Sequence, residues 1–168
     1  MKYLITGASG QLGQKVIAHL KTLVPASDIV ALVRSDAARD AYATQGIETR
    51  FGDYDQPETL TEAFKGIDKL LLISGSAVGQ RIAQHTAAVN AAKAAGVGYI
   101  AYTSLLRADV SPMALAVEHK ATEEAIKASG IPYTFLRNGW YTENILMTLE
   151  QDLSLGQHFG AAGNGKFA

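Results

Sequence analysis

Three glycines near the start of the chain could bind a phosphate group. Gly7, Gly10 and Gly13 are spaced three apart, directly after the apolar segment Lys2-Tyr3-Leu4-Ile5-Thr6, which has the length and composition of a buried strand. From Gln11 the apolar residues recur at helical spacing. In such a turn the backbone N–H groups and the positive end of the helix dipole face a pyrophosphate. The segment predicts a dinucleotide-binding turn; the alternative is a glycine-rich turn without a ligand.

We expect a different structural role for each of these three glycines. We expect Gly7 to adopt a backbone angle that a side chain would forbid. Gly10 is expected where the backbone approaches the pyrophosphate, and Gly13 where the helix packs closely on its strand.

The elements that position this turn alternate regularly along the rest of the chain. Further strands are predicted at 29–33, 48–51, 69–74, 99–103 and 133–137, and helices at 36–45, 57–64, 80–95 and 112–129. Apolar strands separated by helices indicate a parallel sheet covered on both faces. With the glycine turn first, the prediction is an α/β, doubly wound parallel sheet, the NAD(P)-binding Rossmann fold.

In such a sheet, ligands bind beyond the carboxyl ends of the strands. The aromatic and hydroxyl groups of Tyr102 and Thr103 could contact a nicotinamide, and Trp140 could form a wall of the substrate pocket, although Tyr102 and Trp140 could equally be packing residues. The candidate residues at the strand ends are Gly7 to Leu12, Arg34-Ser35, Ser74-Gly75-Ser76, Thr103-Ser104 and Asn138-Gly139-Trp140.

The end of the second strand bears on cofactor preference. An acidic residue there would bind the ribose 2′-hydroxyl of NAD, whereas this chain has Arg34, whose guanidinium suits a 2′-phosphate. The sequence therefore favours NADP(H); the alternative is a surface arginine, and Asp36 could pair with it. Asp53, after the third strand, could accept a hydrogen bond from an adenine amino group or could be a turn residue.

Composition restricts the class of protein. The 168 residues, 48% hydrophobic and 18% charged, fit one soluble domain, and the net charge of -1 without a basic run implies neither nucleic acid nor an anionic membrane as a partner. The absence of cysteine excludes disulfides and thiolate sites. No leader and no apolar run near the ~18 residues of a membrane span are present, so a cytoplasmic protein is expected. His19, His85 and His158 have no metal-ligand spacing, and no metal site is expected.

Five ordered segments resemble one family: TGASGQLG, LVRS, KLLLISGS, AAKAAGVGYIAYTSLL and ASGIPYTFLRNGWYTEN. They are similar to the NmrA-like branch of the atypical short-chain dehydrogenase/reductases, and within it to NAD(P)H-dependent quinone oxidoreductases related to triphenylmethane reductases. The resemblance runs from Lys2 to about Lys166. It implies hydride transfer from NADPH directly to a small-molecule quinone, without flavin. Assembly into a homo-oligomer is left open. The implied cofactor residues are Thr6, Gly7, Ala8, Ser9, Gly10, Gln11, Leu12, Arg34, Ser74, Gly75, Ser76, Asn138, Gly139 and Trp140, to which we add Thr103 from its place at a strand end.

The resemblance also implies that a part is missing. Family members continue with a small C-terminal lobe that covers the substrate, so we expect an NADP(H)-binding domain at 1–155 and, at 156–168, the start of a segment leading to that lobe. Two alternatives to a quinone reductase are an NADP(H)-sensing regulatory protein and a cofactor-binding fragment without activity.

The catalytic residues are less clear from the sequence. The Tyr-x-x-x-Lys pair of ordinary short-chain dehydrogenases is absent, because no tyrosine lies four residues before His119 or Lys120. His119 is in helical register with Thr122 and Ile126, which predicts that it faces the sheet. We expect His119 to orient the nicotinamide ribose or relay a proton; the alternative is a core histidine.

The opposite face of the same helix is predicted to be polar. Lys120 shares this face with Glu123, Glu124 and Lys127. Lys120 is therefore expected to be a solvated charge.

Overall fold

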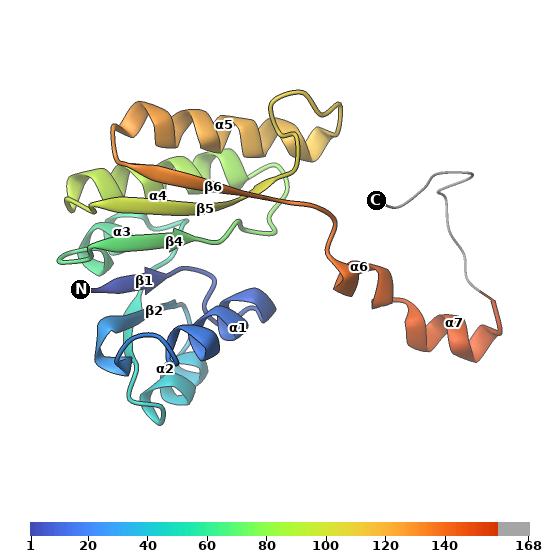
Figure 1. The fold of residues 1–168 in the computed structure, drawn as a ribbon, viewed down its shortest axis with the longest axis horizontal. Coiled ribbons are helices and arrows are strands. Elements are labelled where there is room, and N and C mark those ends of the chain that lie inside the picture. Colours follow the sequence, from blue (N-terminus) through green and yellow to red (C-terminus); the bar gives the residue numbers. More distant parts are fainter. Residues whose placement is uncertain (158–168) are drawn as a thin grey trace. The chain divides into compact units, whose positions relative to one another are not determined.

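The computed structural model describes residues 1–157, and its strands form one six-stranded sheet in the order β3-β2-β1-β4-β5-β6 (Figure 1). The pairs β1 with β2, β1 with β4, β2 with β3, and β4 with β5 are parallel. The strands are β1 (Tyr3–Ile5), β2 (Ile29–Val33), β3 (Glu48–Phe51), β4 (Lys69–Leu72), β5 (Tyr99–Leu105) and β6 (Tyr133–Asn138).

The order of the strands confirms the doubly wound prediction. From β1 the chain moves outward to β2 and β3, and then returns to the other side of β1 for β4, β5 and β6. The direction of winding therefore reverses between β1 and β4, and ligands bind at this switch point in open α/β sheets. The connecting helices are α1 (Gln11–Leu20), α2 (Asp36–Ala43), α3 (Pro57–Ala63), α4 (Arg81–Ala94) and α5 (Ala114–Ser129).

Alternate strand residues enter two separate cores. Leu4 lies in one hydrophobic cluster with Leu60 of α3 and Val89 of α4, whereas its neighbour Ile5 lies in the other with Ile17 of α1. Because successive strand side chains point to opposite faces, α1 and α2 cover one face of the sheet and α3, α4 and α5 pack on the other. This two-sided burial explains why an inner strand such as β2, Ile-Val-Ala-Leu-Val with every residue buried, is continuously apolar, whereas the edge strand β3, Glu-Thr-Arg-Phe, is not.

Strand β4 ends two residues before its predicted end. The Ile73 N–H donates to Thr6 Oγ1 at 2.9 Å, and the Ser74 N–H donates to Thr103 Oγ1 at 2.8 Å. Side-chain hydroxyls of the neighbouring strands thus replace the carbonyl acceptors of the ladder. The chain leaves the sheet early, and Ser74 becomes the start of a loop.

The chain from Asn138 onward forms a second compact unit, which we describe by itself. It contains α6 (Thr142–Leu146) and α7 (Leu149–Leu155), two short helices that the sequence analysis did not predict. The predicted C-terminal segment at 156–168 lies almost wholly outside the described residues, as does His158, and the boundary at 155 stays a prediction. Within residues 1–157, no helix is long and apolar enough to cross a membrane.

Candidate cofactor site

The structure bears out the predicted backbone geometry at Gly7 and Gly13 of the glycine turn. Gly7 has φ +58°, a left-handed conformation that favours glycine, and its carbonyl accepts a hydrogen bond from Gly10 N–H at 3.0 Å. A Cβ on Gly13 would lie 2.2 Å from the Gly7 oxygen and 2.7 Å from Ala8 Cα. Only glycine at position 13 therefore lets α1 pack on the turn.

Gly10 is restricted by the turn itself, and its expected approach to a pyrophosphate stays a prediction. A Cβ there would lie 3.2 Å from the Gly7 oxygen, so the turn itself already restricts this position. Its exposed outer side is still open to a ligand, and a side chain at Gly10 would disturb both the turn and the approach of a phosphate.

Helix α1 begins at this turn without a cap. No side chain caps its N-terminus, and its first turn carries no acidic residue, whereas Ser35 Oγ caps α2 by accepting from Ala38 N–H at 3.3 Å. The first N–H groups of a helix have no partner within the helix. A phosphate on the glycine turn would meet these donors and the positive end of the dipole, so the residues fit a dinucleotide.

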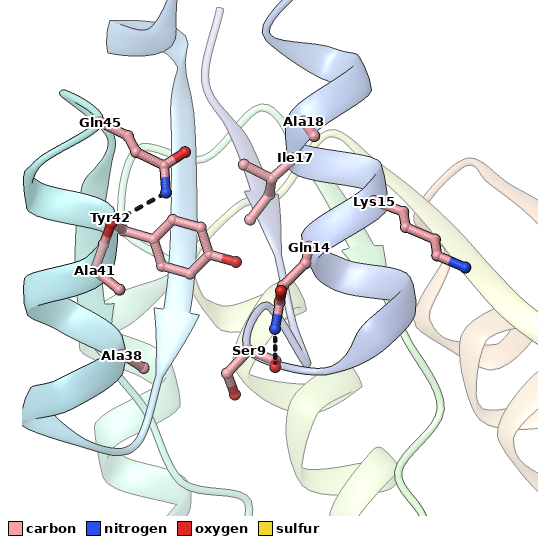
Figure 2. Close-up of a pocket in the computed structure, with 9 residues that line it drawn as sticks. All are labelled: Ser9, Gln14, Lys15, Ile17, Ala18, Ala38, Ala41, Tyr42 and Gln45. Atoms are coloured by element: carbon pink, nitrogen blue, oxygen red, sulfur yellow. Dashed lines mark hydrogen bonds between the residues drawn. The ribbon is translucent and has the colours of Figure 1, made fainter. Parts of the chain in front are cut away.

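Two side chains hold the carbonyls of the turn away from that position. Tyr42 of α2 donates from its hydroxyl to Ala8 O at 2.6 Å. Gln14 of α1 donates from its amide to Ser9 O at 2.7 Å (Figure 2). Burial raises the pKa of Tyr42, which keeps its hydroxyl a donor. Both residues line an open cavity of about 470 Å³ between α1 and α2, on the helix side of the turn. The cavity thus flanks the turn rather than the strand ends.

The ends of β1, β4 and β5 are joined by the hydroxyls of Thr6 and Thr103, both of which are buried. Thr6 binds Ile73 N–H and Thr103 binds Ser74 N–H, as described above. The structure therefore brings together three of the predicted groups: the glycine turn, the Ser74–Ser76 loop and Thr103. Their role in cofactor binding stays a prediction.

The Ser74–Ser76 loop is fixed from below by α4. Gly75 N–H donates to His85 Nε2 at 3.0 Å, and Gly75 O accepts from Arg81 Nε at 2.8 Å. His85 and Arg81 are both buried. Sequence analysis assigned no role to Arg81 and considered His85 only as a metal ligand.

His119 faces inward, as predicted, and forms a buried pair with Tyr102. The two are joined by a 2.7 Å hydrogen bond between Tyr102 OH and His119 Nδ1. Burial, with the Arg81 charge nearby, lowers the pKa of His119 to about 4, and burial raises the pKa of Tyr102. Both groups are neutral at pH 7, so they share a single hydrogen bond between Tyr102 OH and His119 Nδ1, and Nε2 of the imidazole is not used by it.

Glu123 contradicts the predicted polar face of α5. Its side chain is buried, accepts from Ser104 Oγ at 2.6 Å and forms two hydrogen bonds with Arg137 of β6, at 2.9 and 2.7 Å. The Arg137 and Ser104 hydrogen bonds overcome the opposing effect of burial and lower the pKa of this carboxyl. Lys120 is exposed, as predicted. The sequence analysis placed Glu123 on the polar face with Lys120, but Glu123 also lies four residues after His119, at the boundary of the buried face, where Arg137 of β6 supplies its hydrogen bonds.

The ends of β2 and β3 supply the remaining candidates. Arg34 is exposed, and the suggested partner Asp36 instead pairs with Arg39 at 2.7 Å. Asp53 acts as a turn residue, since its carboxylate accepts from Asp55 N–H at 3.1 Å. Of the two roles considered for Asp53, the structure shows that of a turn residue. Arg34 is available to a ligand, because Asp36 pairs with Arg39.

Tyr54, next to Asp53, carries a buried hydroxyl with no hydrogen-bond partner among the described residues. Its ring meets the His85 ring edge-on, with centroids 6.1 Å apart. Burial raises the pKa of Tyr54 to about 12, against the opposing influence of the Thr6 hydroxyl and the Arg34 charge. An unsatisfied buried hydroxyl is rare and lies here beside the candidate site.

Asn138, Gly139 and Trp140 belong to the second unit. Asn138 ends β6 and donates from its amide to Tyr141 OH at 2.9 Å, and Trp140 is 59% exposed. Their predicted part in cofactor binding stays a prediction. Over residues 1–157, no group of three or more metal-ligating side chains comes together.

The sequence held one signal for the residues that were missed. Polar side chains recur with helical spacing in two helices that pack together: Arg81, Gln84 and His85 on α4, and Glu118, His119, Thr122 and Glu123 on α5. Complementary polar positions on two otherwise apolar helix faces indicate a buried network.

The sheet, its glycine turn at the switch point and the polar loops at its carboxyl edge define the class of dinucleotide-binding α/β proteins. A family model described as NAD(P)H-binding matches residues 7–158. The chain belongs to this NAD(P)H-binding family. It is also 36% identical to an NmrA-like family domain-containing oxidoreductase of Aspergillus flavus, over 90% of the chain and 55% of the relative, in agreement with the sequence resemblance.

Individual relatives support this placement. The chain is 57% identical to quinone oxidoreductase 2 of Escherichia coli strain K12, over 98% of the chain and 57% of the relative. A crystal structure of the NADPH-dependent quinone oxidoreductase of Escherichia coli with NADPH matches with a TM-score of 0.91 and 56% identity, covering 95% of this chain and 56% of that one. The crystal structure of a Citrobacter triphenylmethane reductase complexed with NADP(H) matches with a TM-score of 0.88 and 47% identity. The match covers 92% of this chain and 55% of that one. The chain spans little more than half the length of these relatives.

Proposed function

We propose that the chain is the cofactor-binding half of an NADPH-dependent quinone reductase. The observation that carries the proposal is the 56% identity and TM-score of 0.91 to a quinone oxidoreductase in complex with NADPH. The glycine turn, the uncapped start of α1 and the exposed Arg34 are consistent with it, because they offer donors to a pyrophosphate and to a 2′-phosphate.

When bound, NADPH supplies a hydride that, with one proton, converts a quinone to a hydroquinone. The part of this chain is to bind and orient. The glycine turn and α1 hold the phosphates, Arg34 selects the 2′-phosphate, and the Ser74–Ser76 loop and Thr103 flank the end of the site next to Tyr102 and His119.

The state of His119 determines what it can contribute. With a pKa lowered to about 4 and Nδ1 bonded to the Tyr102 hydroxyl, the imidazole has Nε2 left for a ligand and holds no extra proton at pH 7. A neutral imidazole can orient a ribose hydroxyl or a quinone oxygen by hydrogen bonding. We therefore propose that His119 orients its ligand and that the proton comes from solvent.

One observation favours a second candidate, an NADP(H)-sensing regulatory protein. The described part of the chain has no Tyr-x-x-x-Lys pair on α5, and the buried histidine there is neutral. A sensor would bind NADPH without oxidising it.

The deciding experiment follows NADPH oxidation at 340 nm with a panel of benzoquinones and naphthoquinones. It is run on this chain and on its full-length form, with binding of NADPH measured by calorimetry on both. Quinone-dependent oxidation supports the reductase. Tight NADPH binding by the full-length form without turnover of any quinone would support the sensor and contradict the reductase.

A further inference from the structure

The loop after β4 is held through its main chain by side chains that lie beneath it. Both backbone groups of Gly75 bond to α4: its N–H to His85 Nε2 and its carbonyl to Arg81 Nε. At the other end of the loop, Gly79 N–H donates to Glu118 Oε1 of α5 at 2.7 Å. These three hydrogen bonds hold the loop through the backbone of Gly75 and Gly79 and do not involve the side chains of Ser74 and Ser76.

The hydrogen bonds of His85 fix its tautomer. Nε2 accepts from Gly75 N–H, so the imidazole proton is on Nδ1, which donates to Thr122 Oγ1 at 3.0 Å. The Thr122 hydroxyl in turn donates to the Glu118 carbonyl at 2.9 Å. Burial and the Arg81 charge lower the pKa of His85 to about 3. The acceptor at Nε2 is therefore present at every pH near neutrality.

Arg81 and Glu118 form a buried ion pair between α4 and α5. Apolar side chains at such a helix contact would commonly be as stable or more so, because burying two charges is costly. Here each partner forms one more hydrogen bond, to the loop: Arg81 donates to Gly75 O, and Glu118 accepts from Gly79 N–H. The polar atoms of the pair are thus directed at loop backbone as well as at each other.

We propose that His85 and Arg81 are positioning residues that hold Gly75, and that they fix the Ser74–Ser76 loop for cofactor binding. The inference rests on the proposed function, since that function makes the loop part of the NADPH site. It also links the loop to α5, the helix that carries His119, through Thr122 and Glu118. Nothing in the comparisons assigns a role to either residue.

The test compares His85→Leu with His85→Gln. Leucine fills the space but removes the acceptor, whereas the glutamine carbonyl can take the place of Nε2. Two quantities are measured: the exchange rate of the Gly75 amide by NMR and the Kd of NADPH by calorimetry. We expect His85→Leu to speed Gly75 exchange and raise the Kd, each on the order of tenfold, as one lost hydrogen bond allows. His85→Gln should restore both to within about threefold of wild type.

Two further variants separate positioning from stability. Arg81→Lys keeps a cation for Glu118 but removes the Nε–H donor to Gly75, so it should raise the Kd by several-fold. Ile126→Val removes one methyl group from the fully buried face of α5 and costs about 1 kcal/mol of stability. It should leave the Kd unchanged, since it leaves the Gly75 contacts intact.

The outcomes distinguish this inference from the proposed function. Wild-type affinity and slow Gly75 exchange in His85→Leu would overturn the inference while leaving NADPH binding established. Equal loss in His85→Gln and His85→Leu would also overturn it, because the acceptor would then be irrelevant. Absence of NADPH binding by the wild-type chain would contradict the proposed function and, with it, this inference.

Discussion

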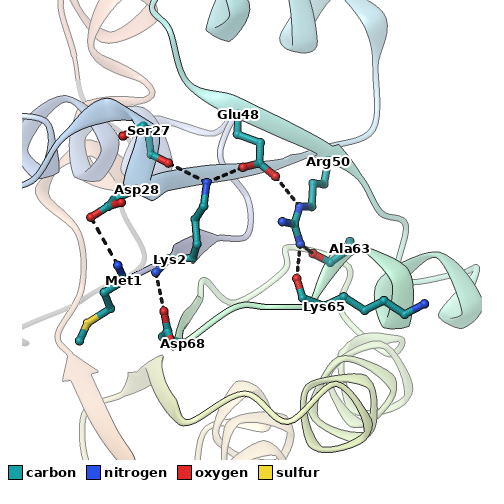
Figure 3. Close-up of polar contacts among 9 residues, drawn as sticks. All are labelled: Met1, Lys2, Ser27, Asp28, Glu48, Arg50, Ala63, Lys65 and Asp68. Carbon is teal, nitrogen blue, oxygen red and sulfur yellow. Dashed lines mark hydrogen bonds and ion pairs between the residues drawn. The ribbon is translucent and has the colours of Figure 1, made fainter.

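The two edges of the sheet use polar residues in opposite ways. At the amino edge, charged side chains on the surface bond to one another and to nearby carbonyls (Figure 3). Lys2 Nζ lies 2.7 Å from both Ser27 O and Glu48 Oε2, and Arg50 donates to Glu48 Oε1 at 2.8 Å. Arg50 also reaches two carbonyls at the end of α3, those of Ala63 and Lys65, at 2.7 and 2.6 Å.

At the carboxyl edge, the polar side chains are buried and hold loops. His85, Arg81 and Glu118 bond to backbone groups of the loop after β4, and Tyr42 bonds to the glycine turn. The start of α1 has no side-chain cap. The amino edge thus satisfies its charges among its own residues, whereas the carboxyl edge fixes the backbone of its loops with buried side chains and leaves the start of α1 without a side-chain cap. The difference teaches that burial of polar groups, rather than their number, marks the ligand edge.

The largest expected effect tests whether the carboxyl edge depends on close backbone contact. Gly13→Ala places a Cβ against the Gly7 oxygen and Ala8 Cα, so we expect loss of measurable NADPH binding and about 3 kcal/mol of destabilisation. Calorimetric titration and denaturant unfolding check this. Gly46→Asn, at a left-handed position with open space, is the control and should change stability by less than about 1 kcal/mol.

A variant at the amino edge should show the reverse pattern. Arg50→Met removes the hydrogen bonds to Glu48, Ala63 and Lys65. We expect it to lower the free energy of unfolding by about 1 to 2 kcal/mol and to leave the Kd of NADPH unchanged. If Arg50→Met weakens NADPH binding as strongly as Gly13→Ala does, the contrast between the two edges fails.

Cofactor preference sharpens the comparison at the end of β2. Arg34 is exposed and Asp36 is paired with Arg39, so the Arg34 guanidinium is available to a 2′-phosphate. We expect NADPH to bind more tightly than NADH, and Arg34→Ala to remove most of that difference, on the order of 1 to 3 kcal/mol. Arg39→Ala should preserve the preference. Equal affinities of the wild-type chain for the two cofactors would contradict the role of Arg34.

The buried histidines of the carboxyl edge predict a pH dependence of stability. Their pKa values lie at about 3 for His85 and about 4 for His119, below the 6.5 of an unfolded histidine, because burial and Arg81 disfavour the charged form. Glu118 and Glu123 oppose this shift at His119 without reversing it. Below pH 6.5 the unfolded chain takes up protons that the folded chain does not, so stability falls as pH falls.

Each histidine should cost about 1 kcal/mol of unfolding free energy between pH 6.5 and 5.5. Denaturant unfolding at pH 7.5, 6.5 and 5.5 measures the change for the chain, for His85→Gln, for His119→Gln and for the variant that carries both substitutions. The wild-type chain should lose more unfolding free energy than the double variant as the pH falls, and each single variant should show about half of that extra loss. Identical pH profiles in all four chains would show that these imidazoles are not buried in the neutral form.

The smallest effect is expected at the helix face that carries His119. Because His119 is neutral and bonded to Tyr102, His119→Ala should lower the rate of quinone reduction by less than the ~10² to 10⁴ typical of losing a general acid or base. Lys120→Ala, on the exposed face, should change it little. Steady-state rates of the full-length enzyme at saturating NADPH decide this. A collapse in Lys120→Ala with normal His119→Ala would restore a lysine-centred mechanism.

The sequence by itself determined the architecture. The glycine spacing, the apolar strands and the helix signals each arise from neighbours along the chain, and local propensity agreed with the final fold at every strand. The inward direction of His119 followed from helical register, which is also local. These features could be predicted because each depends on short-range geometry.

The tertiary structure decided which polar groups meet. Glu123 is buried with two hydrogen bonds from Arg137, on the neighbouring strand, and helical spacing on α5 alone does not identify that partner. Gly75 is bound by His85 and Arg81 because α4 folds back beneath its own loop, and Glu118 joins them from a helix 37 residues along the chain from Arg81. Long-range pairing of buried charges depends on the packing of whole elements, so it becomes visible only when the sheet is assembled.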